Sequence, residues 1–155
     1  MHADLRVEDA GQVILVKCNS IIIENLNFSH TDVGIELWQT KNARIANNSI
    51  KNNRYSGIML LDSSNNNIAG NNITKDNIGV SLDGSSNFNT VSGNNIANNN
   101  VGLGLYGWPP KGNSIYHNNF INNTEQAYNQ RSNSDLSHRC SLHLSGSIHR
   151  LDSTI

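Results

Sequence analysis

The sequence predicts an all-β protein, a right-handed parallel β-helix of about five coils with repeats of 22–24 residues. Three observations support this fold. Two short motifs recur at a nearly constant spacing, the apolar residues inside each motif alternate, and asparagine is strongly over-represented, with 28 copies of which 25 lie between Asn42 and Asn133. A repeat of roughly 20–45 residues whose units share one core is typical of a solenoid.

The first motif is a glycine followed by alternating apolar residues. It occurs as Gly34-Ile35-Glu36-Leu37 and recurs from Gly57, Gly79 and Gly102, at spacings of 23, 22 and 23 residues. Successive side chains of a strand point to opposite faces, so the two apolar residues of each copy share one face. We therefore expect one short strand of each coil at this motif, with its leucine pointing into the core.

The second motif has the form apolar-x-x-Asn-x-apolar. Its asparagines are spaced 23, 23 and 24 residues apart, at Asn48, Asn71, Asn94 and Asn118, and Leu26 fills the same place in an earlier copy. No segment shows the i, i+3, i+4, i+7 apolar pattern of a long amphipathic helix. Each coil is therefore expected to hold two or three short strands joined by polar corners.

Asparagine suits these corners for two physical reasons. It tolerates the left-handed backbone conformation that tight turns require, and identical stacked amides can hydrogen-bond in a ladder. We predict a structural ladder in one column: Asn48, Asn71, Asn94 and Asn118. A second column is predicted at the next corner: Asn53, Asp76, Asn99 and Asn123.

The repeats divide the chain into three predicted parts. Residues 1–12 form a lead-in, residues 13–133 the β-helix, and residues 134–155 a tail without asparagine and without a copy of either motif. We expect this tail to be disordered or truncated. Because neither end carries a pattern that would cap an exposed sheet edge, the chain is expected to be a piece of a longer protein.

Charge and composition exclude several classes of function. The 11 basic and 12 acidic residues give a formal net charge of -1, so no general basic field collects nucleic acid. The first ten residues lack the apolar core of a signal peptide, and no segment is long and apolar enough to insert in a membrane. The two cysteines, Cys18 and Cys140, form no CxxC motif, and whether they pair is left open.

Two stretches of the repeats resemble a known family. They are Ser63-Ser64-Asn65-Asn66-Asn67-Ile68 with Gly70-Asn71-Asn72-Ile73, and the segment from His117 to Tyr128. Both are similar to the repeats of NosD-like and CASH-type right-handed β-helix proteins, over about residues 13–133. The resemblance implies an exported protein that is extracellular, periplasmic or at the cell surface. It does not imply one activity, because lyases, hydrolases, binding proteins and surface proteins share such repeats.

One column of residues follows the inward leucine of each first motif, so it is predicted to face outward. It consists of Trp38, Leu61, Asp83 and Tyr106. Trp108 lies just beyond it, and Asp62 falls one position from the place of Asp83. Exposed rings can stack on sugars and carboxylates can accept hydroxyl hydrogen bonds, which predicts a polysaccharide or cell-envelope glycan as the partner. The simpler interpretation is that these rings only cover the corner of a structural surface protein.

Catalysis on this fold requires clustered carboxylates, either as an acid–base pair or as a calcium site with a nearby base. Asp62 and Asp83 lie in neighbouring coils, but Asn-Thr-Asp, Asp-Asp and Gly-His-Gly signatures are absent from the sequence. We therefore favour a non-catalytic domain and assign no catalytic residue. The alternative is a fragment of a polysaccharide lyase or glycoside hydrolase whose catalytic coils lie outside this chain.

The resemblance to NosD-like proteins also implies periplasmic maturation of the copper centre of nitrous oxide reductase. Copper is bound by histidine, methionine and cysteine side chains. Three such residues fall at different repeat positions: His30, Met59 and His117. Ligand-like spacing occurs only in the tail, at His138, Cys140 and His143, where the resemblance has ended. We therefore predict no metal site and no cofactor, and copper maturation stays an alternative.

Open end coils lead to a prediction about assembly. An unpaired strand edge can pair with another chain, so we predict weak self-association at high protein concentration unless the tail covers the last coil. Sedimentation velocity over a range of concentrations measures it, and the sedimentation coefficient should rise with concentration. A monomer at every concentration would contradict the prediction.

Overall fold

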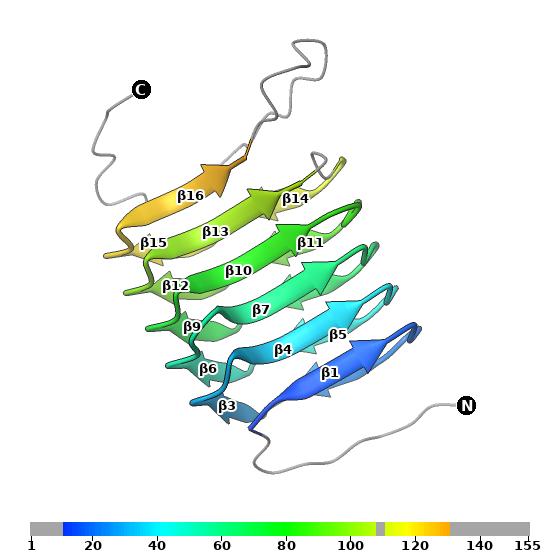
Figure 1. The fold of residues 1–155 in the computed structure, drawn as a ribbon, viewed down its shortest axis with the longest axis horizontal. Coiled ribbons are helices and arrows are strands. Elements are labelled where there is room, and N and C mark those ends of the chain that lie inside the picture. Colours follow the sequence, from blue (N-terminus) through cyan, green and yellow to red (C-terminus); the bar gives the residue numbers. More distant parts are fainter. Residues whose placement is uncertain (1–10, 108–110, 131–155) are drawn as a thin grey trace.

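The computed structural model describes residues 11–107 and 111–130. Trp108 and the tail residues His138, Cys140 and His143 therefore lie outside the described residues. Within the described ranges the chain is a right-handed parallel β-helix of about five coils, which confirms the predicted fold class (Figure 1). The coils are stacked in sequence order, with β1 at one end and β16 at the other.

Each full coil contributes one strand to each of three parallel sheets. The large sheet consists of β1 (Val13–Val16), β4 (Val33–Trp38), β7 (Ser56–Leu61), β10 (Ile78–Asp83), β13 (Val101–Tyr106) and β16 (Glu125–Asn129). The second sheet consists of β2 (Ile22–Glu24), β5 (Arg44–Ala46), β8 (Asn67–Ala69), β11 (Thr90–Ser92) and β14 (Ser114–Tyr116). The third sheet consists of β3 (Asn27–Ser29), β6 (Ser49–Lys51), β9 (Asn72–Thr74), β12 (Asn95–Ala97) and β15 (Asn119–Ile121).

Strand register reproduces the period of the sequence. Ile35 pairs with Ile58 in the next coil, and the same column continues through Val80 and Leu103 to Ala127. Inward apolar side chains therefore stack in columns and form one continuous core. Its fully buried members include Ile35, Leu37, Ile45, Ile50, Ile58, Leu60, Ile68, Ile73, Val80, Leu82, Val91, Ile96 and Leu103. Each such side chain contributes roughly 1.5–3 kcal/mol through its removal from water.

The glycine of the first motif is explained by close approach between coils. A Cβ atom placed on Gly79 would lie 2.6 Å from the carbonyl oxygen of Gly102 and 2.8 Å from Cγ2 of Ile96. Gly34 and Gly57 are equally confined by the carbonyl of the following coil. The chain therefore bends into the large sheet at a point where no larger residue fits.

The column of Asn48, Asn71, Asn94 and Asn118 lies at the corner between the second and third sheets, where it forms hydrogen bonds from each coil to the next. Nδ2 of Asn71 donates to Oδ1 of Asn94 at 3.0 Å, and the backbone N–H of Asn71 donates to the same oxygen at 2.9 Å. The same pair of bonds links Asn48 to Asn71 and Asn94 to Asn118. Each amide thus satisfies a buried backbone group that has no strand partner.

Two further columns serve the corner between the large sheet and the second sheet, and neither was predicted from the sequence. In one, backbone N–H groups donate to the hydroxyls of Thr40, Ser63 and Ser86. In the other, they donate to the amide oxygens of Asn66, Asn89 and Asn113. At these corners of the solenoid, a side-chain oxygen from the next coil therefore accepts a backbone N–H, although the residue type differs from column to column.

Left-handed backbone at the corners accounts for more of the asparagine content. Of the fifteen non-glycine residues with positive φ in the described ranges, seven are asparagine. The residues with positive φ occur in columns, with one residue from each coil. One such column has φ between 51° and 60° and consists of His30, Asn52, Lys75, Asn98 and Asn122. Asparagine tolerates this region better than most residues.

The ladder predicts a difference between two adjacent asparagines. Asn94→Ala removes the acceptor of two bonds from Asn71, so the free energy of unfolding should fall by about 2–4 kcal/mol. Asn95→Ala is the matched control, because the side chain of Asn95 bonds only the exposed amide of Asn72, and it should cost less than about 1 kcal/mol. Denaturant unfolding measures both. Equal losses would show that the buried amides do not hold the coils together.

Candidate ligand-binding face

The predicted outward column is present as a continuous row on the large sheet, and we call it the outer column. Trp38 pairs with Leu61, Leu61 with Asp83, and Asp83 with Tyr106, at the last residue of four successive strands. Trp38 is 45% exposed, and the other three side chains are half-buried. Strand alternation places them on the outer face, because the preceding leucines are buried in the core.

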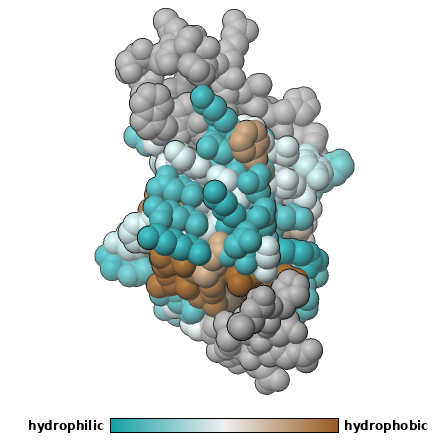
Figure 2. All heavy atoms as spheres, turned by 90° about the vertical axis from the view of Figure 1, so that its right-hand side faces the viewer, coloured by the Kyte–Doolittle hydropathy of each residue, from teal (hydrophilic) through white to brown (hydrophobic). Residues whose placement is uncertain are grey.

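The chemical character of the outer column changes along the solenoid. Val16 of β1 pairs with Trp38, so the row is apolar from Val16 through Leu61 and polar at Asp83 and Tyr106. Figure 2 shows the side of the molecule on the right of Figure 1, which is largely hydrophilic and carries a hydrophobic area toward the N-terminal coil. Ile14 and Val16 are both more than half exposed in that coil. One ligand lying along the row would therefore meet apolar surface at one end and hydrogen-bonding groups at the other.

Tyr106 is held by two contacts that sequence reasoning missed. Its ring lies over Gly104, where an added Cβ would collide with the ring, and it packs against Tyr128 with 5.5 Å between ring centroids. Tyr128 belongs to this face because it pairs with Gly104 across β13 and β16. The spacing from Gly104 to Tyr128 follows the repeat, so extending the register into the last coil would have identified it.

Asp83 is a half-buried carboxylate without a bonded cation in the described part of the chain. The hydroxyl of Ser81 donates to its Oδ1 at 2.6 Å. Burial raises the pKa of Asp83, and this hydrogen bond partly opposes the effect. Burial also raises the pKa of the Tyr106 hydroxyl, with the negative charge of Asp83 adding to it. Tyr106 therefore stays a hydrogen-bond donor beside an acceptor.

Asp62 directly follows Leu61 of the outer column, but its carboxylate is bonded to the backbone of the corner. It adopts a φ of 50°, and its Oδ1 accepts the backbone N–H of Ser85 at 2.9 Å. The carboxylate thus caps the corresponding turn of the next coil. In that coil, Gly84 stands at the position equivalent to Asp62. Asp62 and Asp83 are therefore bonded to different groups, the turn backbone and the Ser81 hydroxyl.

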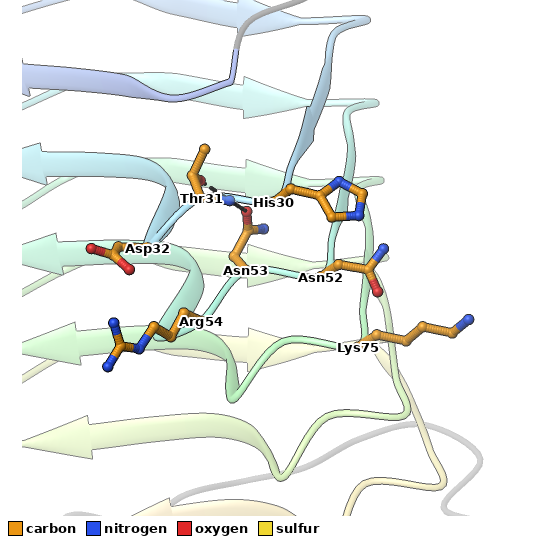
Figure 3. Close-up of a pocket in the computed structure, with 7 residues that line it drawn as sticks. All are labelled: His30, Thr31, Asp32, Asn52, Asn53, Arg54 and Lys75. Carbon is orange, nitrogen blue, oxygen red and sulfur yellow. Dashed lines mark hydrogen bonds between the residues drawn. The ribbon is translucent and has the colours of Figure 1, made fainter.

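A polar hollow of about 510 Å³ lies at the corner between the third sheet and the large sheet (Figure 3). Its lining residues are His30, Thr31, Asp32, Asn52, Asn53, Arg54 and Lys75. In Figure 3 Asp32 and Arg54 point to one side, whereas His30, Asn52 and Lys75 point to the other. The charged groups do not converge, so the hollow has no reactive cluster.

Potential metal ligands do not gather in the described part of the fold. Within residues 11–107 and 111–130, no group of three or more histidine, cysteine, aspartate or glutamate side chains comes together. Copper sites need such convergent ligands, and so do calcium sites built from carboxylates. The described residues therefore do not fit a copper site built from three or more histidine, cysteine or carboxylate ligands. Among those same residues, no helix is long and apolar enough to cross a membrane.

The stacked parallel coils and their corner ladders define a parallel β-helix repeat protein. The family model described as NosD, periplasmic copper-binding protein, matches residues 4–141, and the chain belongs to this family. NosD is a periplasmic family, which is consistent with an exported protein. Searches of curated proteins and of solved structures gave no match.

Proposed function

We propose that the outer column binds a linear glycan, and that the chain is a non-catalytic β-helix domain of an exported protein. The observation that carries the proposal is the register that aligns Trp38, Leu61, Asp83 and Tyr106 in one row, with the tryptophan ring exposed. Periplasmic and cell-surface proteins meet polysaccharides and cell-envelope glycans, and this row has the chemistry to recognise them.

The dimensions of the row suit an extended ligand. Coils are spaced by about 4.8 Å, so Trp38 and Tyr106 are separated by three steps, or about 14 Å along the solenoid axis. A short oligosaccharide segment can span that distance, with its sugar faces against the two rings. The row runs parallel to the axis, and a linear polymer lying along it would contact every coil.

The polar end of the outer column, at Asp83 and Tyr106, would determine which way round a glycan lies and which sugars bind. Asp83 has one carboxylate oxygen bonded by Ser81, which leaves the second to accept a sugar hydroxyl. Tyr106 can donate from its hydroxyl while its ring, packed on Tyr128, presents a rigid surface. Such a combination of aromatic surface and a few oriented polar groups is typical of glycan-binding sites.

A non-catalytic role is supported by the position of the carboxylates. Asp62 is bonded to the turn backbone and Asp83 to Ser81, and neither is bonded to a basic side chain among the described residues. The acid–base pairs of glycosidases require two carboxyl groups across one bond of the substrate. The outer column has one carboxylate.

Binding of the full chain to a panel of neutral and acidic polysaccharides, chitin and isolated peptidoglycan tests the proposal. The double variant Trp38→Ala/Tyr106→Ala should lower affinity for the bound polymer by about 5- to 150-fold, since each ring contributes about 0.5–1.5 kcal/mol by stacking. Tyr116→Ala is the matched control, because this tyrosine is 41% exposed on the second sheet and should leave binding unchanged. No binding to any polymer, or equal loss in the control, would contradict a glycan-binding outer column.

A further inference from the structure

The predicted second column, at the corner between the third sheet and the large sheet, also forms a ladder of hydrogen bonds, which we call the second ladder. One of its residues differs in chemistry from its neighbours. Asp76 occupies the column of Thr31, Asn53, Asn99 and Asn123, and it is only 4% exposed. Its Oδ1 accepts the backbone N–H of Asn53 at 2.7 Å and Nδ2 of Asn53 at 2.9 Å. Its Oδ2 is buried and has no hydrogen-bond partner among the described residues.

The glycine column shows what Oδ2 replaces. An added Cβ at Gly79 or Gly102 would lie 3.1 Å from Nδ2 of Asn99 or Asn123, respectively. At the equivalent Gly57, the nearest ladder atom is Oδ2 of Asp76, at 2.7 Å. Oδ2 therefore occupies the site that an amide nitrogen fills in the other coils.

In the two following coils, the amide nitrogen at that site donates to a carbonyl oxygen. Nδ2 of Asn99 donates to the carbonyl of Ile73, 26 residues earlier, and Nδ2 of Asn123 donates to that of Ile96. The equivalent group for Asp76 is the carbonyl of Ile50 in β6. An ionised carboxylate would place two acceptors against each other with no hydrogen between them, at a buried position.

We propose that protonation of Asp76 controls the stability of the second ladder, and we call this carboxyl group the latch. Protonated, its Oδ2–H donates to the carbonyl of Ile50 and completes the ladder as an asparagine does. Ionised, after its proton leaves to solvent, it repels that carbonyl and weakens the contact between β6 and the corner after β9.

The titration range of the latch follows from burial. Burial raises the pKa of Asp76 from 3.8 to about 7, and the two bonds from Asn53 act in the opposite direction. The unfolded chain ionises near pH 4, whereas the folded chain keeps the proton until about pH 7. The latch therefore stabilises the fold fully below about pH 4, and this stabilisation is lost as pH rises toward 7.

Other ionisable groups surround this corner without bonding the carboxylate in the described structure. On the preceding coils they are His30, Asp32, Arg54 and Tyr55, and on the same turn Lys75. Four of these line the open hollow of Figure 3. The following corner, Asn98 to Asn100, presents amides only. The titration of Asp76 can therefore be separated from theirs by substitution.

Denaturant unfolding of the full chain between pH 4 and pH 9 tests the latch. Asp76→Asn supplies the residue that other coils use, so the variant should fold and gain relative stability as pH rises. The unfolding equilibrium constant of the parent should increase roughly 500-fold over that of the variant between pH 4 and pH 8, because the carboxyl pKa is about 7 in the folded chain and 3.8 in the unfolded chain. Asp32→Asn, the same chemical change at an exposed residue of this corner, should follow the parent. Parallel pH profiles for the parent and Asp76→Asn would overturn the proposal.

Titration of the carboxyl groups in the parent chain tests the proposal even if the variant does not fold. Carboxyl carbon NMR of the parent should show one aspartate titrating near pH 7, and Asp76→Asn should remove that signal. Titration of every aspartate near pH 4 would also overturn the proposal. Neither readout depends on glycan binding, so failure here leaves the proposed function standing.

Discussion

The structure depends on one requirement: each inner corner of the solenoid leaves a buried backbone N–H that no strand can satisfy. Within the stack the next coil provides a side-chain oxygen, as from Asn94 to Asn71 in the first ladder and from Ser63 to Thr40 in another column. An unsatisfied buried group costs about 1–3 kcal/mol, so open corners throughout the stack would together cost more than the roughly 5–15 kcal/mol by which a folded domain is typically stable. The abundance of asparagine follows from this requirement and from the left-handed turns.

This internal arrangement fixes the inward-facing residues but leaves the choice of residue on the outer faces unconstrained. Inward positions are fixed by core packing, by the glycines that bend into the large sheet and by the ladders. Outward positions need only be compatible with a strand. Because strict register aligns them, a residue type chosen once per coil becomes a row on the surface, and this is how Trp38 and Tyr106 come to share the outer column. A repeat protein of this class can therefore acquire a binding surface with little change to its fold.

Sequence reasoning identified what repeats and missed what does not. The period and the alternation of Ile35 and Leu37 predicted the coils, and the motif around Asn94 predicted the position of the first ladder. The column of Thr40, Ser63 and Ser86 was missed, because its members differ in residue type and share only an oxygen at one position. Tyr128 was missed because the glycine-apolar motif ends before the last coil. The unpaired Oδ2 of Asp76 could not be foreseen, since a repeat pattern does not say which side-chain atoms of a column are left without a hydrogen-bond partner.

The side-chain amides of the ladder give the most direct measurement of the central claim, that these amides are buried structural bonds. Hydrogen exchange followed by NMR should find the Nδ2 protons of Asn71 and Asn94 protected to the level of core backbone amides, because both donate to buried acceptors. The exposed corner residues Asn65 and Asn98 should exchange at the rate of free amides. Equally fast exchange at all four residues would contradict the account.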